Sequence, residues 1–306
     1  MNELSLQSPW SKRFMAWMHE RFPLQNALLF FILYVTTASV ARAGLPSSSL
    51  HVWDIMGCML SWSFFLLLRI FDEHKDYERD CVNFPGRVLQ RGLIRLVDLK
   101  VVGVVAVLVQ SGMALYRDRG IGPTTESWLL MIFWASLMTK EFFVADWLNR
   151  HLTIYAFSHM LIMPLVVLWL AALAQPGHVG SMSLHVLMIL ALVSGFCFEI
   201  TRKTKGPEEE RPSVDSYSRI FGYRNAGLIV MVLVLVMLLL QVLLLGTLGK
   251  QSWMATLVIM MFGLQALVAL IQYLRAPSQQ ARERNEKSVA LAMLAGYAVV
   301  VAAMFF

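Results

Sequence analysis

Nine apolar stretches of about 20 residues divide this chain and restrict it to one kind of architecture. They lie at about 25–41, 52–70, 97–115, 127–145, 152–174, 182–199, 225–246, 252–273 and 288–306. Only 15% of the residues are charged and 58% are hydrophobic, whereas soluble domains carry about 25% charged residues. The three cysteines match no metal-ligand spacing and are expected to be free thiols. We therefore predict an all-α polytopic membrane protein with nine transmembrane helices.

The distribution of basic residues predicts the orientation of these helices. With a cytoplasmic N-terminus, 22 of the 26 lysines and arginines lie on the cytoplasmic side, and the other four are Arg42, Arg117, Arg119 and Lys250. Because Lys and Arg concentrate on the cytoplasmic side of membrane proteins, we predict that the N-terminus is inside. The net charge of +6 then reflects orientation and not nucleic-acid binding. The simplest expected location is the inner membrane, if the source is bacterial.

The two longest connections, at 71–96 and 200–224, both lie on the predicted cytoplasmic side and carry much of the charge. Loops of this length are where binding and catalytic residues most often occur. We therefore expect a single domain over 1–306 in which these two loops form a polar cap over a site that faces the cytoplasm. Residues 10–23, a mixed apolar and basic stretch, are expected to lie at the membrane interface.

The second predicted span runs directly into an acidic cluster. If its helix continues, Asp72, Asp76 and Asp80 lie on one face, with Glu73 beside them. Carboxylates at this spacing repel one another, and their hard oxygen ligands suit Mg²⁺ shared with phosphate oxygens. The alternative is a solvated helix end, neutralised by neighbouring lysines and arginines.

A turn with two spaced arginines, Arg87 and Arg91, follows this cluster and offers direct partners for a diphosphate. The run Asp72-Glu73-x-x-Asp76-x-x-x-Asp80 followed by Pro85-x-Arg87-x-Leu89-x-x-Gly92-x-Ile94 resembles the first aspartate-rich motif of the UbiA superfamily of intramembrane prenyltransferases. That motif is usually written N-D-x-x-D-x-x-x-D and is followed by R-P-L-x-x-G-x-I. Nine spans with the N-terminus inside also agree with the family. Asp72 replaces the usual Asn and Glu73 the usual Asp, and both substitutions keep oxygen ligands.

The second charged loop departs from the family pattern. UbiA-like enzymes carry a D-x-x-x-D motif here, whereas this chain has Glu199-x-x-x-Lys203. In one interpretation, Arg202 and Lys203 replace the second metal by contacting phosphate directly. In another, the loop folds back so that acidic residues farther along, Glu208, Glu209, Glu210 or Asp215, complete a metal site. In the third, the loop is a solvated connector without catalytic function.

Two further positions are candidates for substrate binding. Residues 146–153 weakly resemble the family's K-R-x-T stretch, in which Arg150 is the remaining basic residue. Arg150 is equally explained as an arginine that anchors the helix at the membrane surface. Tyr217 lies at the start of the seventh predicted span, where an anion can bind, and its alternative role is to cap the helix.

The resemblance implies Mg²⁺-dependent transfer of an isoprenyl group from a prenyl diphosphate to a lipophilic acceptor, most commonly an aromatic one, among membrane lipids. The implied metal ligands are Asp72, Glu73, Asp76 and Asp80. The implied catalytic residues are Asp72, Asp76, Asp80, Arg87 and Lys203, and the implied substrate-binding residues are Arg91, Arg150, Glu199, Arg202 and Tyr217. The alternatives are a UbiA-type terpene cyclase, a phosphosugar–polyprenyl transferase, or a non-catalytic lipid-binding or scaffold protein.

Overall fold

The computed structural model describes residues 4–45, 51–210 and 216–305, and every regular element in these ranges is a helix. The longer helices are α1 (Trp10–Arg21), α2 (Ala27–Ala41), α3 (Trp53–Lys75), α5 (Leu96–Asp118), α6 (Pro123–Thr139), α8 (Leu152–Met160), α9 (Ile162–Ala174), α10 (Met182–Arg202), α12 (Tyr223–Thr247), α13 (Trp253–Arg275) and α14 (Gln279–Phe305). The short helices are η1 (Leu24–Asn26), α4 (Tyr77–Asn83), η2 (Glu141–Phe143), α7 (Ala145–Asn149), η3 (Pro176–His178), η4 (Pro207–Glu209) and α11 (Tyr217–Phe221). The predicted all-α class is confirmed.

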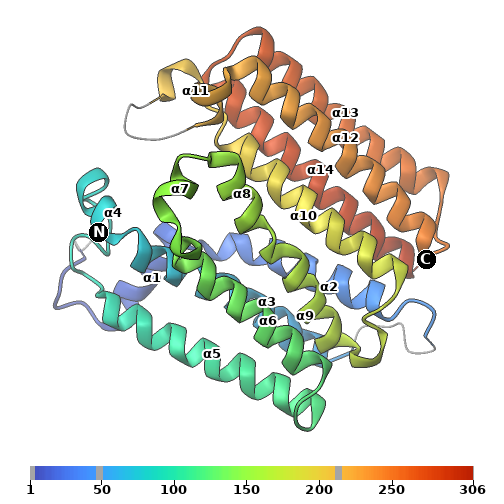
Figure 1. Cartoon of the computed structure of the whole chain (residues 1–306), viewed down its shortest axis with the longest axis horizontal. Helices are drawn as coiled ribbons and strands as arrows, with labels where there is room; N and C mark the ends of the chain where they lie inside the picture. Colours follow the sequence, from blue (N-terminus) through green and yellow to red (C-terminus); the bar gives the residue numbers. More distant parts are fainter. Residues whose placement is uncertain (1–3, 46–50, 211–215, 306) are drawn as a thin grey trace.

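The long helices pack as a closed ring in chain order. Each of α2, α3, α5, α6, α9, α10, α12, α13 and α14 contacts the next, and α14 closes the ring by packing against α2. Figure 1 shows the short helices α4, α7 and α11 at one end of this bundle and the C-terminus at the other. The described parts of the two long charged loops therefore lie at the same end, as the predicted sidedness requires.

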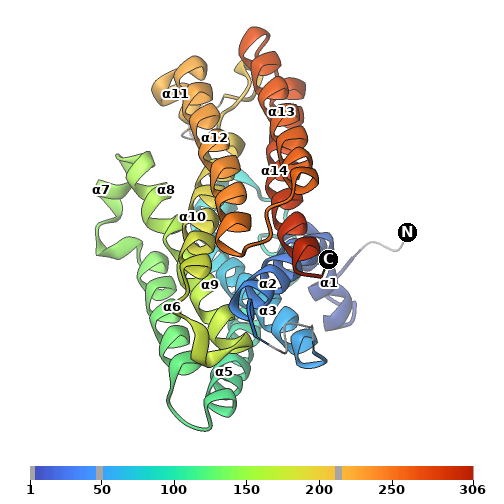
Figure 2. The same cartoon turned by 90° about the vertical axis from the view of Figure 1, so that its right-hand side faces the viewer.

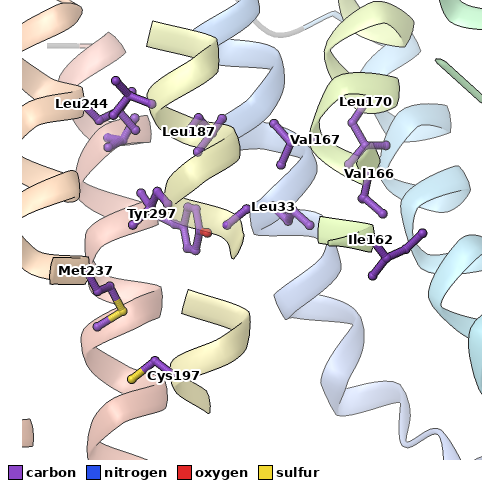
Figure 3. Close-up of a cluster of buried hydrophobic side chains, with 14 of the residues drawn as sticks. Leu33, Ile162, Val166, Val167, Leu170, Leu187, Cys197, Met237, Leu244 and Tyr297 are labelled. Carbon is purple, nitrogen blue, oxygen red and sulfur yellow. The ribbon is translucent and has the colours of Figure 1, made fainter. Parts of the chain in front are cut away.

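The core lies where α2, α9 and α10 pack across the ring against α12 and α14. Figure 3 shows Leu33 of α2 facing Val167 of α9, with Leu187 of α10 and Tyr297 of α14 beside them. All four side chains are at most 5% exposed. Burial on this scale, together with close packing of small residues, holds helices together where lipid removes the hydrophobic drive for association.

Eight of the described helical segments are long and apolar enough to cross a membrane. The predicted span at 127–145 corresponds to α6, which has 17 residues and ends at Thr139. At about 1.5 Å per residue, α6 is roughly 25 Å long, slightly less than the hydrocarbon core of about 30 Å. The expected continuation to residue 145 is wrong, because Glu141, Phe142 and Phe143 all have positive φ angles that a right-handed helix cannot accommodate. The number of nine spans stays a prediction.

The helix predicted at 152–174 is interrupted. It consists of α8 and α9, which meet at Leu161. Pro164 explains the interruption, because a proline has no N–H to donate to the carbonyl of Met160 and its ring clashes with that carbonyl. The short helix α8 can therefore point its residues into the end of the bundle at a different angle from α9.

Helix α1 packs against the bundle, rather than simply preceding it at the membrane surface. Trp17 and Met18 are at most 2% exposed and pack with Leu66 and Ile70 of α3. Figure 2 shows α1 lying beside α2 and α3 on the outside of the ring. This position brings the end of α1 next to the charged end of α3.

Candidate functional site

A cavity of about 450 Å³ lies where the ends of α3, α6, α8, α9 and α10 converge. Apolar side chains such as Phe65, Leu68 and Met163 form part of its wall. Its charged lining consists of Arg69, Asp72, Lys75, Asp76, Arg79, Glu199, Arg202 and Lys203. Because five of these are basic and three acidic, the lining has an excess of positive charge, which favours an anionic group next to an apolar one.

The acidic cluster does not form one continuous stripe. Helix α3 ends at Lys75, and Asp76 (φ −95°, ψ 4°) separates it from α4. Asp72 and Asp76 line the cavity, whereas Asp80 does not. The expectation that the three aspartates share one helix face is therefore wrong, because Asp80 is held away from the cavity by two arginines, Arg87 and Arg21 of α1.

Those arginines belong to a neighbouring group of charges, the Arg21 cluster, formed by Arg21, Arg69, Glu73, Asp80 and Arg87, of which Arg69 also lines the cavity. The Arg21 Nε lies 2.6 Å from the Glu73 Oε1, and the Arg69 Nη2 lies 2.8 Å from the same oxygen. The Arg87 Nη1 lies 2.6 Å from the Asp80 Oδ2, and the Arg21 Nη2 lies 3.5 Å from it. Glu73 is only 1% exposed. Glu73 therefore pairs with Arg21 of α1 and with Arg69, whereas Asp80 pairs with Arg87 and Arg21. None of Glu73, Asp80 and Arg87 lines the cavity.

The predicted second motif forms the opposite wall of the cavity. The Lys203 Nζ lies 2.8 Å from the Glu199 Oε1, and the Arg202 Nη2 lies 2.7 Å from the Glu199 Oε2. One carboxylate thus orients two cations at the end of α10. The structure brings Glu199, Arg202 and Lys203 to the same cavity as Asp72 and Asp76, although Glu199 lies 123 positions after Asp76 in the chain.

Two cavity residues, Lys75 and Tyr155, were not predicted. The Lys75 Nζ donates a hydrogen bond of 2.8 Å to the Tyr155 hydroxyl and lies 3.7 Å from the Glu141 Oε1. The Tyr155 ring is 5.5 Å from the Lys75 Nζ and 5.6 Å from the Lys203 Nζ, so it separates two ammonium groups. Lys75 belongs to the recognised charged segment, but nothing in the sequence distinguishes Tyr155 from other aromatic residues at a span end.

Three predicted substrate-binding residues lie outside the cavity lining. Arg91 is exposed in the loop after α4, and Arg150 is exposed and donates to the carbonyl oxygen of Asp146 at 3.0 Å. Tyr217 is fully buried, and its hydroxyl donates to the carbonyl oxygen of Leu152 at 3.3 Å. Burial raises the pKa of the Tyr217 phenol above its ordinary value. Tyr217 therefore connects α11 to the start of α8.

The acidic residues after α10 are engaged away from the cavity. Glu209 forms an ion pair of 2.7 Å with Arg282 of α14. Glu210 accepts hydrogen bonds from the hydroxyls of Ser216 and Ser218, at 2.7 and 2.6 Å. Glu208 accepts from the backbone of α14. The interpretation in which these glutamates complete a metal site is not supported, and Asp215 lies outside the described residues.

The donors in the cavity match a metal that is shared with a ligand. Within the described ranges, no three His, Cys, Asp or Glu side chains come close enough to hold a metal ion by themselves. Mg²⁺ is usually held by one or two carboxylates together with phosphate oxygens and water. The Asp72 side chain is 52% exposed and its ion pair with Arg69 is long, at 3.9 Å, so its oxygens are accessible. The Asp76 Oδ1 lies 2.8 Å from the Nη2 of Arg79, whose side chain is 67% exposed. Asp72, together with Asp76 in exchange for this surface ion pair, therefore fits a Mg²⁺ ion that arrives with a diphosphate.

Fold and cavity together define the class of this chain: a multi-pass α-helical membrane protein with a charged cavity at one end of its helical ring. Its fold is that of a solved structure of digeranylgeranylglyceryl phosphate synthase in membranes, with a TM-score of 0.69 and 15% sequence identity over 96% of this chain and 100% of that one. No protein-family model matches the sequence, and no curated protein matches it. At this identity the likeness establishes the fold.

Proposed function

We propose that this chain is an intramembrane prenyltransferase of the UbiA kind, which transfers an isoprenyl group from a prenyl diphosphate to a lipophilic acceptor. The observation that carries the proposal is the cavity, in which Asp72 and Asp76 meet Lys203 next to an apolar wall. A prenyl diphosphate has the same two parts, a highly charged head and an apolar chain. The fold shared with a prenyl-glyceryl phosphate synthase supports the same class of reaction.

Asp72 and Asp76 are the proposed ligands of the Mg²⁺ ion. Bound there with the diphosphate, Mg²⁺ supplies Lewis-acid stabilisation of the negative charge on the leaving group. Of the four carboxylates that the motif implies, these two line the cavity. Glu73 and Asp80 are instead proposed to hold α3 and α4 in place through the Arg21 cluster, so that the acidic motif has a structural half and a ligand-binding half.

Lys203 and Arg202 are the proposed replacement for the second aspartate motif. A fixed cation neutralises an oxyanion by direct, charge-assisted hydrogen bonds. Glu199 holds both side chains at 2.7–2.8 Å before substrate arrives. A diphosphate of higher charge would compete with Glu199 for these cations. This arrangement favours direct phosphate contact over a solvated connector, because Glu199, Arg202 and Lys203 all line the cavity.

In the proposed reaction, the bond between the prenyl C1 carbon and the diphosphate oxygen breaks, and its electron pair leaves with diphosphate. Preorganised cations stabilise the developing charge without reorganisation. The acceptor forms its new bond to C1 and releases a proton. Apolar residues such as Phe65 and Leu68 exclude water from the allylic cation. The site is proposed to open toward the cytoplasm, in agreement with the predicted sidedness.

The acceptor is proposed to be lipophilic, and two classes should be tested. The resemblance implies an aromatic acceptor, whereas the structural neighbour is named for a prenylated glyceryl phosphate. Both should be screened in detergent and in nanodiscs with prenyl diphosphates of several chain lengths.

The first experiment is a titration of purified protein with a radiolabelled prenyl diphosphate, with and without Mg²⁺. Asp76→Asn should abolish the Mg²⁺-dependent part of binding. The matched control is Asp146→Asn, because Asp146 is an exposed aspartate on α7 that does not line the cavity. Binding that is unaffected by Mg²⁺ and by Asp76→Asn would refute the enzyme proposal. Mg²⁺-dependent binding without turnover for any acceptor would favour the lipid-binding or scaffold alternative.

A further inference from the structure

A second cavity, of about 520 Å³, lies at the opposite end of the bundle. It is enclosed by the ends of α2, α5 and α9 and the start of α3. Helix α3 has 23 residues and is therefore about 35 Å long. Its first residues line this outer cavity and its last residues line the proposed active site. The two cavities are thus distinct sites on opposite sides of the bundle.

This second cavity, called the outer cavity because it lies at the predicted non-cytoplasmic end, is lined by several of the basic residues that are rare at that end. Four lysines and arginines lie at this end of the chain's spans. Three of them, Arg42, Arg117 and Arg119, line the cavity, whereas Lys250 does not. Because positive residues are depleted on the non-cytoplasmic side, three arginines around one cavity indicate a specific use for their charge.

Arg42 forms a fixed and neutralised part of the wall. Its guanidinium binds Asp54 through two contacts of 2.8 Å, and the Tyr34 hydroxyl donates to the same carboxylate at 2.8 Å. This arrangement depends on Gly57, because a Cβ at that position would lie 2.0 Å from the Tyr34 ring. Asp54 therefore neutralises the charge of Arg42.

Arg117 and Arg119 contribute charge that no carboxylate in the described part of the chain pairs with. Arg117 donates to the carbonyl oxygens of Leu173 and Ala174 at the end of α9, at 2.8 and 3.0 Å. The acid between the two arginines, Asp118, instead accepts from the backbone N–H of Thr125 at 2.7 Å. The cavity therefore has two positive charges that no carboxylate in the described residues neutralises, one of them placed against the C-terminal carbonyls of α9.

The rest of the lining is apolar and aromatic. Met56, Leu60 and Met113 line the cavity, and the rings of Trp53 and Tyr116 lie 6.2 Å apart beside it. Trp and Tyr at the ends of spans are typical of the level of lipid headgroups. We propose that this outer cavity binds an anionic membrane lipid, with the phosphate on Arg117 and Arg119 and the start of a chain on Met56, Leu60 and Met113.

Native mass spectrometry tests this lipid site on delipidated full-length protein. The protein is incubated with dioleoyl phosphatidylglycerol, with dioleoyl phosphatidylcholine, or with phosphatidylglycerol in the presence of inorganic phosphate. The wild type should retain phosphatidylglycerol at least about tenfold better than phosphatidylcholine. A tenfold difference in affinity is about what one hydrogen bond to a charged group contributes. The double variant R117Q/R119Q should retain both lipids equally.

Lys250→Gln is the matched control, because it removes the same charge at the same end without touching the cavity. It should keep the wild-type preference. Arg119→Gln alone keeps the contacts of Arg117 with α9 and should reduce the preference in a folded protein. An unchanged preference in R119Q and in the double variant, or its loss in K250Q, would overturn the proposal. Displacement of the lipid by an equal concentration of inorganic phosphate would assign the site to a free anion instead.

Discussion

Replacing Arg21 by Gln should make opening of α1 from the bundle more frequent while leaving the cavity lining intact. The Arg21 guanidinium contacts Glu73, which is 1% exposed, and Asp80, which is 7% exposed. Removing one partner from a buried ion pair costs about 3–5 kcal/mol. Because Glu73 keeps Arg69 and Asp80 keeps Arg87, we expect the lower limit, about 3 kcal/mol. That value corresponds to roughly a hundredfold change in the equilibrium for opening of α1.

Amide hydrogen exchange measures this opening directly. Exchange of the amides in residues 10–21 should accelerate by about a hundredfold in R21Q, while the amides of α9 keep the wild-type rate. Arg95→Gln is the matched control, because Arg95 also pairs with an acid, Asp98, at 3.0 Å but is 74% exposed. Exposed pairs contribute at most about 1 kcal/mol. If α1 exchanges at the wild-type rate in R21Q, or equally fast in R95Q, the Arg21 cluster does not hold α1 in place.

Three further predictions concern the proposed active-site cavity, the outer cavity and the loop after α10. Lys203→Met should weaken prenyl diphosphate binding by about tenfold or more, because a hydrogen bond to a charged group contributes about 1.5–3 kcal/mol; Lys203→Arg should restore most of it in the same titration. Gly57→Ala should lower thermal stability by about 1–3 kcal/mol through overpacking, whereas Gly112→Ala, where a Cβ meets nothing within 4 Å, should not lower it in the same calorimetric scan. Burial raises the pKa of Glu209, but hydrogen bonds and charge from Arg282 outweigh it and hold the pKa below its ordinary 4.5. This carboxylate therefore stabilises the fold above pH 4.5 and loses that effect as the pH falls through the lowered value. Glu209→Gln should remove this part of the acid dependence of the melting temperature, and an unchanged acid dependence would contradict the assignment.

Much of the architecture was predictable because membrane spans are local in the sequence. The stretch at 225–246 consists almost entirely of aliphatic side chains, and α12 occupies Tyr223–Thr247. The span predicted at 127–145 is an exception. The span predicted to end at 145 stops at Thr139, since hydropathy does not report the left-handed backbone at 141–143 that ends the helix.

The candidate site was predictable only in part. The sequence placed Asp72, Asp76 and Lys203 correctly near one end of the bundle, because charge at span ends is a local property. It did not separate these residues from Glu73 and Asp80. The sequence spacing makes all four acids candidate ligands. In the structure, Glu73 and Asp80 are drawn to Arg21 and Arg87, which lie outside the cavity lining, whereas Asp72 and Asp76 line the cavity.

By itself, the sequence determined the helical class of the chain, because the hydropathy of each span is a local property of its side chains. The sidedness stays a prediction from the distribution of Lys and Arg between the loops. Only the tertiary structure decided which charges pair, since Arg21 lies 52 residues from Glu73 and becomes its partner only when α1 packs on α3. The same holds for Arg42, which lies 75 positions before Arg117 in the chain and which the bundle brings to the same cavity as Arg117 and Arg119. Ion pairs and cavities depend on distances in space, and those distances are set by how the helices pack in the ring.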